Sequence, residues 1–465
     1  MSALSQAFTD HIWPALADTP APQTVHWRGE GQLPSAFAVT DLAAASLATV
    51  GLAVAALREQ VGHAPGALAV DRRLASFWFA SSLRPRGWQV PPAWDPLAGD
   101  YPTRDGWIRL HTNAPAHRLA ALSVLGAASE RGELAPRVAQ WAAAELEDSV
   151  VAAGGCAARM LSREQWQAHP QGQALASEPL VAHSVLTGLA RRGWTPDPAR
   201  PLRGLRVLDL TRVLAGPVAS RCLAGLGAEV LRLDPPDWNE PALVPDVTLG
   251  KRCARLDLKS AAGREVFERL LGSADVLLHG YRADALERLG YDRERLDALA
   301  PGRIDVSLNA YGWSGPWRNR RGFDSLVQMS TGIAEAGSHW RGEPQPVPLP
   351  VQALDHATGY LLAAAVLRGL SQRLRDGHGQ AYRLSLARTA QLLQAPAFAA
   401  QPGVALAEVS AEDLAPGIEE TPWGPARRLQ APLQLAATPL HWERPACELG
   451  SAPASWAAPS QSAGR

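Results

Sequence analysis

The sequence has very little lysine and no excess of charge of either sign. Lys251 and Lys259 are the only lysines among 465 residues, and Lys+Arg and Asp+Glu both number 45. A balanced charge gives no electrostatic attraction to nucleic acid or to an anionic membrane surface. We therefore expect neither as a partner, and any anionic ligand must be held by a few local cations.

Cysteine is also scarce, and no cysteine cluster is present. The four cysteines are widely separated: Cys156, Cys222, Cys253 and Cys447. Metal sites and disulfide frameworks place cysteines at short, regular spacings, so the pattern predicts buried thiols in a reducing compartment and no metal site. The first residues lack a basic flank followed by an apolar core of signal-peptide length, and no apolar run approaches the roughly 20 residues of a membrane span. These features favour a cytoplasmic protein.

The chain is long enough for two or three domains, and its apolar fraction of 46% allows sizeable cores. Three prolines between Trp194 and Pro201 predict an extended linker and the main domain boundary. We divide the chain into four regions: 1–91, a partial duplicate of a large-domain element; 92–194, a small α+β domain; 201–395, a large domain; and 396–465, a C-terminal segment that is partly loop.

Strand and helix patterns alternate after the linker. Short apolar runs predict strands at 206–210, 229–234, 275–280 and 303–308, with helices at 262–271, 284–289 and 293–300 between them. This alternation predicts an α/β fold with a doubly wound, Rossmann-like parallel sheet. The loops TRVLAGP, HGYRAD and NAYGWSGP follow three of the strands. They should therefore converge at the carboxyl ends of the strands, where such sheets bind ligands.

The small region is predicted to be α+β. Two short strands flank the turn at 104–106, and helical patterns cover 117–127, 136–154 and 162–175.

Two distant stretches of the chain resemble each other. The stretch from Thr40 to Asp71 matches the one from Leu354 to Ser385, with Asp41 matching Asp355. In each, a predicted buried helix leads through a Gly- and His-containing turn to a strand. We interpret this as a duplication of one supersecondary element. Two unrelated Ala-rich helices are the alternative.

The segment NAYGWSGPWRNRRGFDSLVQMSTG, from Asn309 to Gly332, contains the main candidate site. Asp324 follows Gly322 and Phe323 directly, and Gln328 lies four residues later. A carboxylate placed against a thioester carbonyl can form an acyl anhydride and divide acyl transfer into easier steps. An isolated aspartate after an aromatic residue is otherwise most often a cap or turn residue.

Four segments in order carry a family resemblance: LRGLRVLDLTRVLAGPVASRCLAGLGAEVLRLDPP, GKRCARLDLKSAAGREVFERLLGSADVLLHGYRADALERLGYD, SLNAYGWSGPWRNRRGFDSLVQMSTG, and ALDHATGYLLAAAVLRGL with DGHGQAYRLSL. They resemble the large domain of the family III CoA-transferases, which include formyl-CoA transferase, carnitine CoA-transferase and α-methylacyl-CoA racemase. The resemblance covers 201–393 and extends more weakly to the small region and to 424–450. Family members place the small domain after the large one, so the order here is rearranged.

The resemblance implies transfer of CoA from an acyl-CoA to a carboxylic acid through an aspartyl anhydride and thioester at Asp324. Gly322, Gly312 and Gly315 are expected to let backbone N–H groups approach the developing oxyanion. The CoA thioester is a substrate, and no permanently bound cofactor or metal is expected. The family's interlocked dimers imply a homodimer. The positions that match the CoA-binding ones are Arg212, Ala215, Leu256, Lys259, Gly280, Tyr281, Arg288, Leu289 and Asn309.

Two departures from the family pattern keep alternatives open. HGYRAD stands where Asn-Phe-Arg-Pro-Gly is common, and Phe323 stands where the racemase branch has a histidine. Racemisation needs a second base at the α-carbon, and the sequence assigns none. Three hypotheses remain: a CoA-transferase, an isomerase acting next to the thioester, and a non-catalytic acyl-CoA-binding relative.

Overall fold

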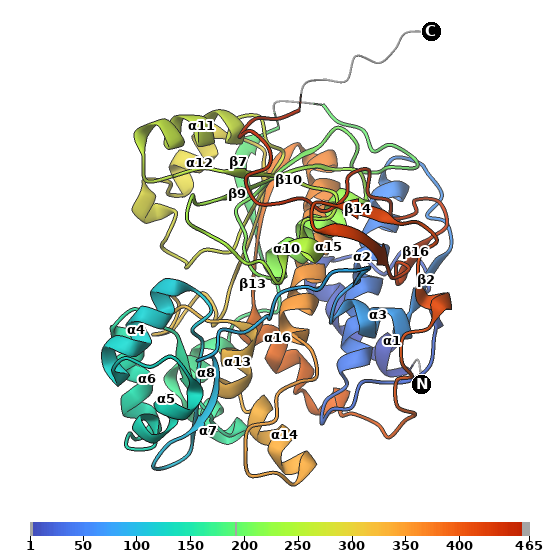
Figure 1. The fold of residues 1–465 in the computed structure, drawn as a ribbon. Helices are drawn as coiled ribbons and strands as arrows, with labels where there is room; N and C mark the ends of the chain where they lie inside the picture. The colour runs from blue at the N-terminus through green and yellow to red at the C-terminus, as the bar shows by residue number, and fades with distance from the viewer. Residues whose placement is uncertain (1–2, 191–192, 458–465) are drawn as a thin grey trace.

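The computed structural model describes residues 3–190 and 193–457, and a seven-stranded sheet lies at its centre (Figure 1). Six strands run parallel, and the last pairs antiparallel at one edge. In spatial order they are β10 (Arg252–Arg255), β9 (Glu229–Asp234), β8 (Arg206–Asp209), β11 (Val276–His279), β12 (Ile304–Asn309), β13 (His378–Ser385) and β7 (Ala182–Leu189). The predicted α/β class with a parallel sheet is confirmed. The antiparallel edge strand β7 was not predicted.

The strand order determines where the loops meet. Counted along the chain, the six parallel strands lie in the order 3-2-1-4-5-6, so the direction of winding reverses between β8 and β11. In sheets of this kind, ligands bind beyond the carboxyl ends of the strands at the reversal. The loops after β8, β11 and β12 therefore leave the same edge of the sheet.

Alternate residues of the strands enter two cores, one on each face of the sheet. Val207 and Val276 pack with α9 and α15, whereas Leu208 and Leu277 pack with α11 and α12. Burial on both faces explains the continuous apolar runs of these strands. The helices of this part are α9 (Ala215–Gly225), α10 (Val244–Val247), α11 (Ala261–Leu271), α12 (Arg293–Leu299), α13 (Asp324–Ser330), α14 (Ile333–Arg341), α15 (Ala353–Asp376) and α16 (Leu386–Leu393). The helix predicted at 284–289 is only a short 3-10 turn, Glu287–Leu289.

Two long helices, α2 (Val39–Gln60) and α15, lie side by side in the larger core (Figure 1). Both helices are rich in alanine, whose small side chain allows two backbones to approach closely. Each helix leads into a strand, β2 (Leu68–Asp71) after α2 and β13 after α15, as the duplicated pattern predicts. By length and composition α2 could also cross a membrane, but 94% of its most apolar window is buried inside the protein.

The first 90 residues and the C-terminal segment share two small sheets. In one, β2 lies between β1 (His26–Arg28) and β16 (Leu433–Leu435); in the other, β15 (Gly424–Arg428) lies between β14 (Glu419–Thr421) and β3 (Leu83–Pro85). Helices α1 (Ala3–Leu16) and α3 (Arg72–Trp78), and the 3-10 turns Pro396–Phe398 and Ala411–Asp413, complete these regions. The two ends of the chain therefore stabilise each other. The parts of the predicted regions at 191–192 and 458–465 lie outside the described residues.

The small region has its own apolar core, which includes Leu97, Tyr101 and Ile108. Its sheet is β4 (Gly99–Pro102), β5 (Trp107–Leu110) and β6 (Ala157–Arg159), and its helices are α4 (Pro115–Leu125), α5 (Arg131–Val138), α6 (Ala143–Ala152), α7 (Arg163–Ala168) and α8 (Pro170–Ala176). The two strands predicted around 104–106 are confirmed. The helices predicted at 136–154 and 162–175 are each divided in two. In the second case Pro170 forces His169 out of the helical conformation.

Candidate active site

A cavity of about 490 Å³ lies at the carboxyl edge of the parallel sheet. Its lining combines residues from both sides of the linker at 194–201: residues 79–81, 92–95, 111 and 113–114 before it, and residues 213–214, 238–243, 246–247, 323–325, 350–352 and 355–356 after it. The volume is in the range of ligand sites in proteins. The single chain therefore encloses this cavity with residues from regions that are far apart in sequence.

Asp324, the predicted catalytic residue, lines this cavity at the first position of α13 and is 1% exposed. One carboxylate oxygen, Oδ1, accepts a hydrogen bond from Gln328 Nε2. The other, Oδ2, accepts one from the backbone N–H of Asp355 at 2.9 Å. Gln328 is itself fixed, because its Oε1 accepts a bond from the Leu349 N–H at 2.7 Å. The carboxylate is thus held at both oxygens.

Burial raises the pKa of Asp324 to about 6, although the hydrogen bonds from Asp355 and Gln328 oppose the shift. Among the described residues, no arginine, lysine or histidine forms an ion pair with this carboxylate. At pH 7 and above the group is mainly ionised but poorly solvated, which favours a nucleophile.

A second carboxyl group, that of Asp355, lines the same cavity from the first turn of α15. In the described part of the chain, no donor lies within hydrogen-bond distance of its oxygens. Burial, and then the negative charge of Asp324, raise the pKa of Asp355 well above its usual value. Two adjacent carboxylates do not both ionise easily, so Asp355 is neutral when Asp324 is charged. Sequence patterns assigned no role to Asp355 beyond its match to Asp41.

Three further polar side chains of the cavity wall have buried atoms without partners among the described residues. They are the Ser325 hydroxyl, Nδ1 of His111 and both ring nitrogens of His356. Buried polar groups are nearly always hydrogen-bonded, so these atoms are available to a ligand. Burial lowers the pKa of His111 and of His356 to about 3, and both rings are neutral at pH 7.

The loop after β8 is strained where it meets the cavity. Val213 has a φ of 67°, the one non-glycine residue with positive φ in the described chain. A β-branched side chain rarely adopts this conformation, and such strain concentrates at functional sites. The Val213 N–H donates to Glu240 Oε2 at 2.9 Å, which holds the loop in place.

The predicted CoA-binding residues fall into three groups. Arg212 stacks between Trp238 and Tyr281, with its Cζ 4.8 Å and 5.2 Å from the ring centroids. Gly280, directly after β11, lies beside Thr211 of the loop after β8, and Ala215 begins α9 at the end of that loop, so the predicted convergence of these two loops is confirmed. A second group, Leu256, Tyr281 and Leu289, packs against one apolar core.

None of the nine predicted residues is among the described residues that line the cavity, and the third group consists of Lys259, Arg288 and Asn309. Lys259 is exposed, and Arg288 is exposed and pairs with Asp284 at 2.6 Å. Asn309 is buried, and its amide group bonds both the N–H and the C=O of Gly312 at 2.8 and 2.7 Å. CoA contacts by all nine residues stay a prediction.

The glycines around Asp324 serve packing and turn formation. A Cβ on Gly322 would lie 2.5 Å from Ala310 Cβ, so only glycine fits there. Gly312 has a φ of 106°, and its N–H is already donated to Asn309. Gly312 therefore has no free N–H for an oxyanion, contrary to the expectation from the sequence. The Ser325 hydroxyl is the unpaired donor directly beside Asp324.

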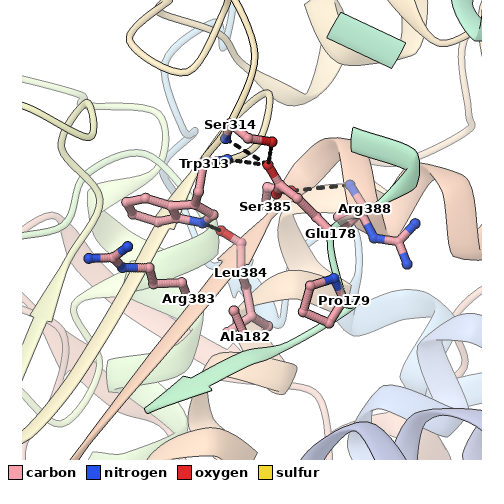
Figure 2. Close-up of a pocket in the computed structure, with 9 residues that line it drawn as sticks. All are labelled: Glu178, Pro179, Ala182, Trp313, Ser314, Arg383, Leu384, Ser385 and Arg388. Carbon is pink, nitrogen blue, oxygen red and sulfur yellow. Dashed lines mark hydrogen bonds between the residues drawn. The ribbon is translucent and has the colours of Figure 1, made fainter. Parts of the chain in front are cut away.

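Figure 2 shows a smaller cavity of about 160 Å³ at the carboxyl end of β13. The Glu178 carboxylate points at the loop after β12 and accepts bonds from the N–H groups of Trp313 and Ser314 at 2.8 and 2.7 Å. The Trp313 indole N–H bonds the Leu384 carbonyl at 3.0 Å. These hydrogen bonds of Glu178 and Trp313 hold in place the loop that leads to Asp324. In the described ranges, no cluster of His, Cys, Asp and Glu is arranged to hold a metal ion.

Comparison with known proteins identifies the relatives of this chain. The sequence profile of CoA-transferase family III matches residues 202–450, which is 249 of 465 residues. A probable fatty acyl-CoA transferase of Mycobacterium tuberculosis is 34% identical over 215 residues, covering 43% of this chain and 54% of that protein. An acyl-CoA transferase of Gibberella moniliformis is 30% identical over 311 residues, covering 60% and 54%. A succinyl-CoA:glutarate CoA-transferase of Mus musculus is 33% identical over 196 residues, covering 39% and 44%. The chain spans about half the length of these curated relatives.

Proposed function

Because this chain belongs to CoA-transferase family III, we propose that it transfers CoA from an acyl-CoA thioester to a carboxylic acid, with Asp324 as the nucleophile. The observation that carries the proposal is the Asp324 carboxylate itself. It is buried at the wall of a 490 Å³ cavity, held at both oxygens, and without a cation partner among the described residues.

In the first half of the reaction, the Asp324 carboxylate attacks the carbonyl carbon of the acyl-CoA. An O–C bond forms, the C–S bond breaks, and CoA leaves as a thiolate. The product on the enzyme is a mixed anhydride of Asp324 and the acyl group. The thiolate then attacks the Asp324 carbonyl carbon and displaces the donor's carboxylate. The enzyme is left with an aspartyl-CoA thioester.

In the second half, the acceptor's carboxylate attacks the aspartyl thioester and CoA leaves again as a thiolate. The thiolate attacks the acceptor's carbonyl carbon, which gives the new acyl-CoA and restores the Asp324 carboxylate. Each step exchanges one acyl bond for another.

The surrounding residues support these steps. Gln328 and the α15 backbone orient the nucleophile, while the unpaired hydroxyl of Ser325 is available to a developing oxyanion. The neutral carboxyl group of Asp355 supplies a second hydrogen-bond donor without adding charge. For CoA, contacts of Arg212 with phosphate and of Tyr281 with an apolar part of the molecule remain predictions from the family resemblance, because neither residue lines the cavity.

The test is a panel of acyl-CoAs and carboxylic acids, assayed with the wild-type protein and with Asp324→Asn. We expect transfer by the wild type and a fall of at least about 10³-fold in kcat for the variant, because Asn cannot form the anhydride. The variant's thermal melting serves as a control for folding. Transfer at the wild-type rate by Asp324→Asn would disprove the nucleophile.

One observation supports an isomerase as a second candidate. His111 lines the same cavity as Asp324 and has an unpaired ring nitrogen among the described residues. It could act as the second base that the sequence did not identify. Exchange of the α-proton in D₂O without CoA transfer would support this reading. Thioester binding with neither reaction would indicate a binding protein.

The expected homodimer and cytoplasmic location are part of the proposal; the first rests on the family resemblance and the second on the sequence features described above. Sedimentation velocity of the purified chain and fractionation of the native host would test them.

A further inference from the structure

We propose that the cavity beside Asp324 takes apolar or aromatic acyl groups that carry no second carboxylate, and that Trp94 sets this preference. The inference rests on the proposed function, because it assigns the acyl group to this cavity. It concerns the distal end of the substrate, away from the thioester.

The first support is the apolar character of the wall. Four aromatic rings line the cavity, those of Phe79, Trp94, Trp238 and Phe323. Val213, Leu214, Leu243, Val247 and Val351 add aliphatic surface between them. Rings and branched side chains stabilise an acyl chain or an aromatic ring by removing its surface from water.

The second support is the lack of a cation in the wall. No lysine or arginine is among the residues that line the cavity in the described chain, and both of its histidines are neutral at pH 7. Five carboxyl groups do line it: Asp95, Glu240, Asp246, Asp324 and Asp355. A second carboxylate on the substrate would therefore be desolvated among carboxyl groups.

The arginines behind this wall are already paired. Arg232 binds Asp234 at 2.9 Å and Glu240 at 2.5 Å, and its side chain is fully buried. Arg221 and Arg428 both bind Asp246 at 2.8 Å.

At the other side of the cavity, Arg118 binds Asp95 at 3.2 Å. These pairs neutralise the wall carboxylates other than Asp324 and Asp355. None of these paired guanidinium groups is free to recruit a substrate carboxylate, and Arg212, which forms no ion pair among the described residues, does not line the cavity.

The reacting carboxylate of the acceptor does not meet the same barrier. When the acceptor enters, Asp324 is held as an uncharged thioester, and burial alone still raises the pKa of Asp355. The acceptor's carboxylate then faces an electrophilic carbon. Only a distal carboxylate stays unpaired throughout the reaction.

Trp94 separates the cavity from an arginine. The Arg109 guanidinium lies 4.8 Å from the Trp94 ring centroid and binds Asp100 at 2.8 Å, yet the ring and not the guanidinium lines the cavity. The ring also meets the edge of His111 at a centroid distance of 5.8 Å. The indole thus presents an apolar surface in place of a positive charge.

The test measures binding in the Asp324→Asn protein, which cannot turn over, so its result does not depend on catalysis. Isothermal titration would compare hexanoyl-CoA and phenylacetyl-CoA with succinyl-CoA and glutaryl-CoA. We expect the uncharged acyl groups to bind at least about 100-fold more tightly. Equal binding of the two classes, tighter binding of succinyl-CoA, or no preference over free CoA would overturn the proposal. A wild type that transfers CoA only from the dicarboxylic thioesters would overturn it while leaving the proposed function intact.

The role of Trp94 is tested by Trp94→Ala in the same Asp324→Asn background. Removing the ring deletes apolar surface and uncovers Arg109, so the hexanoyl to succinyl affinity ratio should shrink by about tenfold or more. Trp340→Ala is the matched control, because Trp340 is a similarly exposed tryptophan on α14 outside the cavity, 49% exposed against 39% for Trp94. It should leave the ratio unchanged. A ratio that Trp94→Ala does not alter, or that both variants alter equally, would overturn the assignment of Trp94.

Discussion

Helices α2 and α15 begin alike and differ in what surrounds their first turn. Each has an aspartate at its third position, Asp41 in α2 and Asp355 in α15. The Asp41 carboxylate accepts hydrogen bonds from Ser5 at 2.6 Å and from Arg72 at 2.9 Å. Asp355 has no such partner among the described residues and faces the cavity beside Asp324.

The difference shows that the residues around a buried aspartate, and not the carboxylate itself, decide whether its role is structural or functional. Arg72 neutralises the charge of Asp41, and Ser5 donates a hydrogen bond to it. Together these contacts connect α2 to α1 and α3. Around α15 the corresponding space holds Asp324 and the cavity. A buried ion pair fixes geometry, whereas an unpaired buried carboxyl group keeps the ability to exchange a proton or a bond.

The largest predicted effect in this comparison is on stability. Arg72→Leu should destabilise the protein by about 3 kcal/mol or more, because it leaves the Asp41 charge buried without its cation. Asp355→Asn replaces one neutral group by another and should change stability by less than about 1 kcal/mol. Urea unfolding of both variants at pH 7 makes the comparison. Equal losses would show that the two aspartates have the same structural role.

Asp324→Asn should have a slightly smaller effect on stability, and this effect should depend on pH. The folded protein keeps a proton on Asp324 up to a pKa of about 6, whereas the unfolded chain releases it near the usual value of 3.8. Wild-type stability therefore falls as pH rises from 4 to 6, and the penalty persists above pH 6. Asp324→Asn should be more stable than wild type by about 3 kcal/mol at pH 8 and equally stable below pH 4. Asp41→Asn should show no such gain at pH 8.

The pH dependence of turnover gives the next prediction. Only ionised Asp324 attacks the thioester, so kcat should fall about tenfold per pH unit below pH 6, where its carboxylate is protonated. In the Asp41→Asn variant, measured on soluble and folded protein, the pH profile of kcat should have the same midpoint as in the wild type. A rate that is flat from pH 5 to pH 8 would contradict an ionising nucleophile with a raised pKa.

The smallest effect concerns Asp355 as a neutral hydrogen-bond donor. Asp355→Ala should lower kcat by about tenfold, and Asp355→Asn should recover most of the loss because the amide still donates. The KM for the acyl-CoA should change less than kcat. If the alanine variant matches wild type in both constants, Asp355 has no part in the reaction.

Much of this architecture could be predicted from the sequence, because local patterns determine it. The apolar runs of β8, β9, β11 and β12 indicate buried parallel strands, and the Asp324 segment is marked by its neighbours Gly322 and Phe323. What sequence patterns could not provide was spatial pairing. Asp355 lies 31 residues beyond Asp324, and its N–H bond to that carboxylate exists only after α13 and α15 pack together.

The N-terminal residues that line the cavity could not be predicted from the sequence either. Trp94 precedes Asp324 by 230 residues, and its segment, PPAWDP, has no periodicity that indicates a helix or strand face. For Gly312, the expectation of a free N–H failed for a related reason. The positive φ of Gly312 follows from its turn, but the Asn309 side chain that occupies its N–H is known only from the structure.

The most direct measurement for the nucleophile is trapping of the acyl-enzyme with hydroxylamine. Hydroxylamine added during turnover of an acyl-CoA should cleave the aspartyl anhydride or thioester and convert the Asp324 carboxyl group to a hydroxamate. Peptide mass spectrometry should find this modification at Asp324, only when acyl-CoA is present, and at neither Asp355 nor Asp41. Transfer activity without modification of Asp324, or with modification at Asp355 instead, would contradict the account.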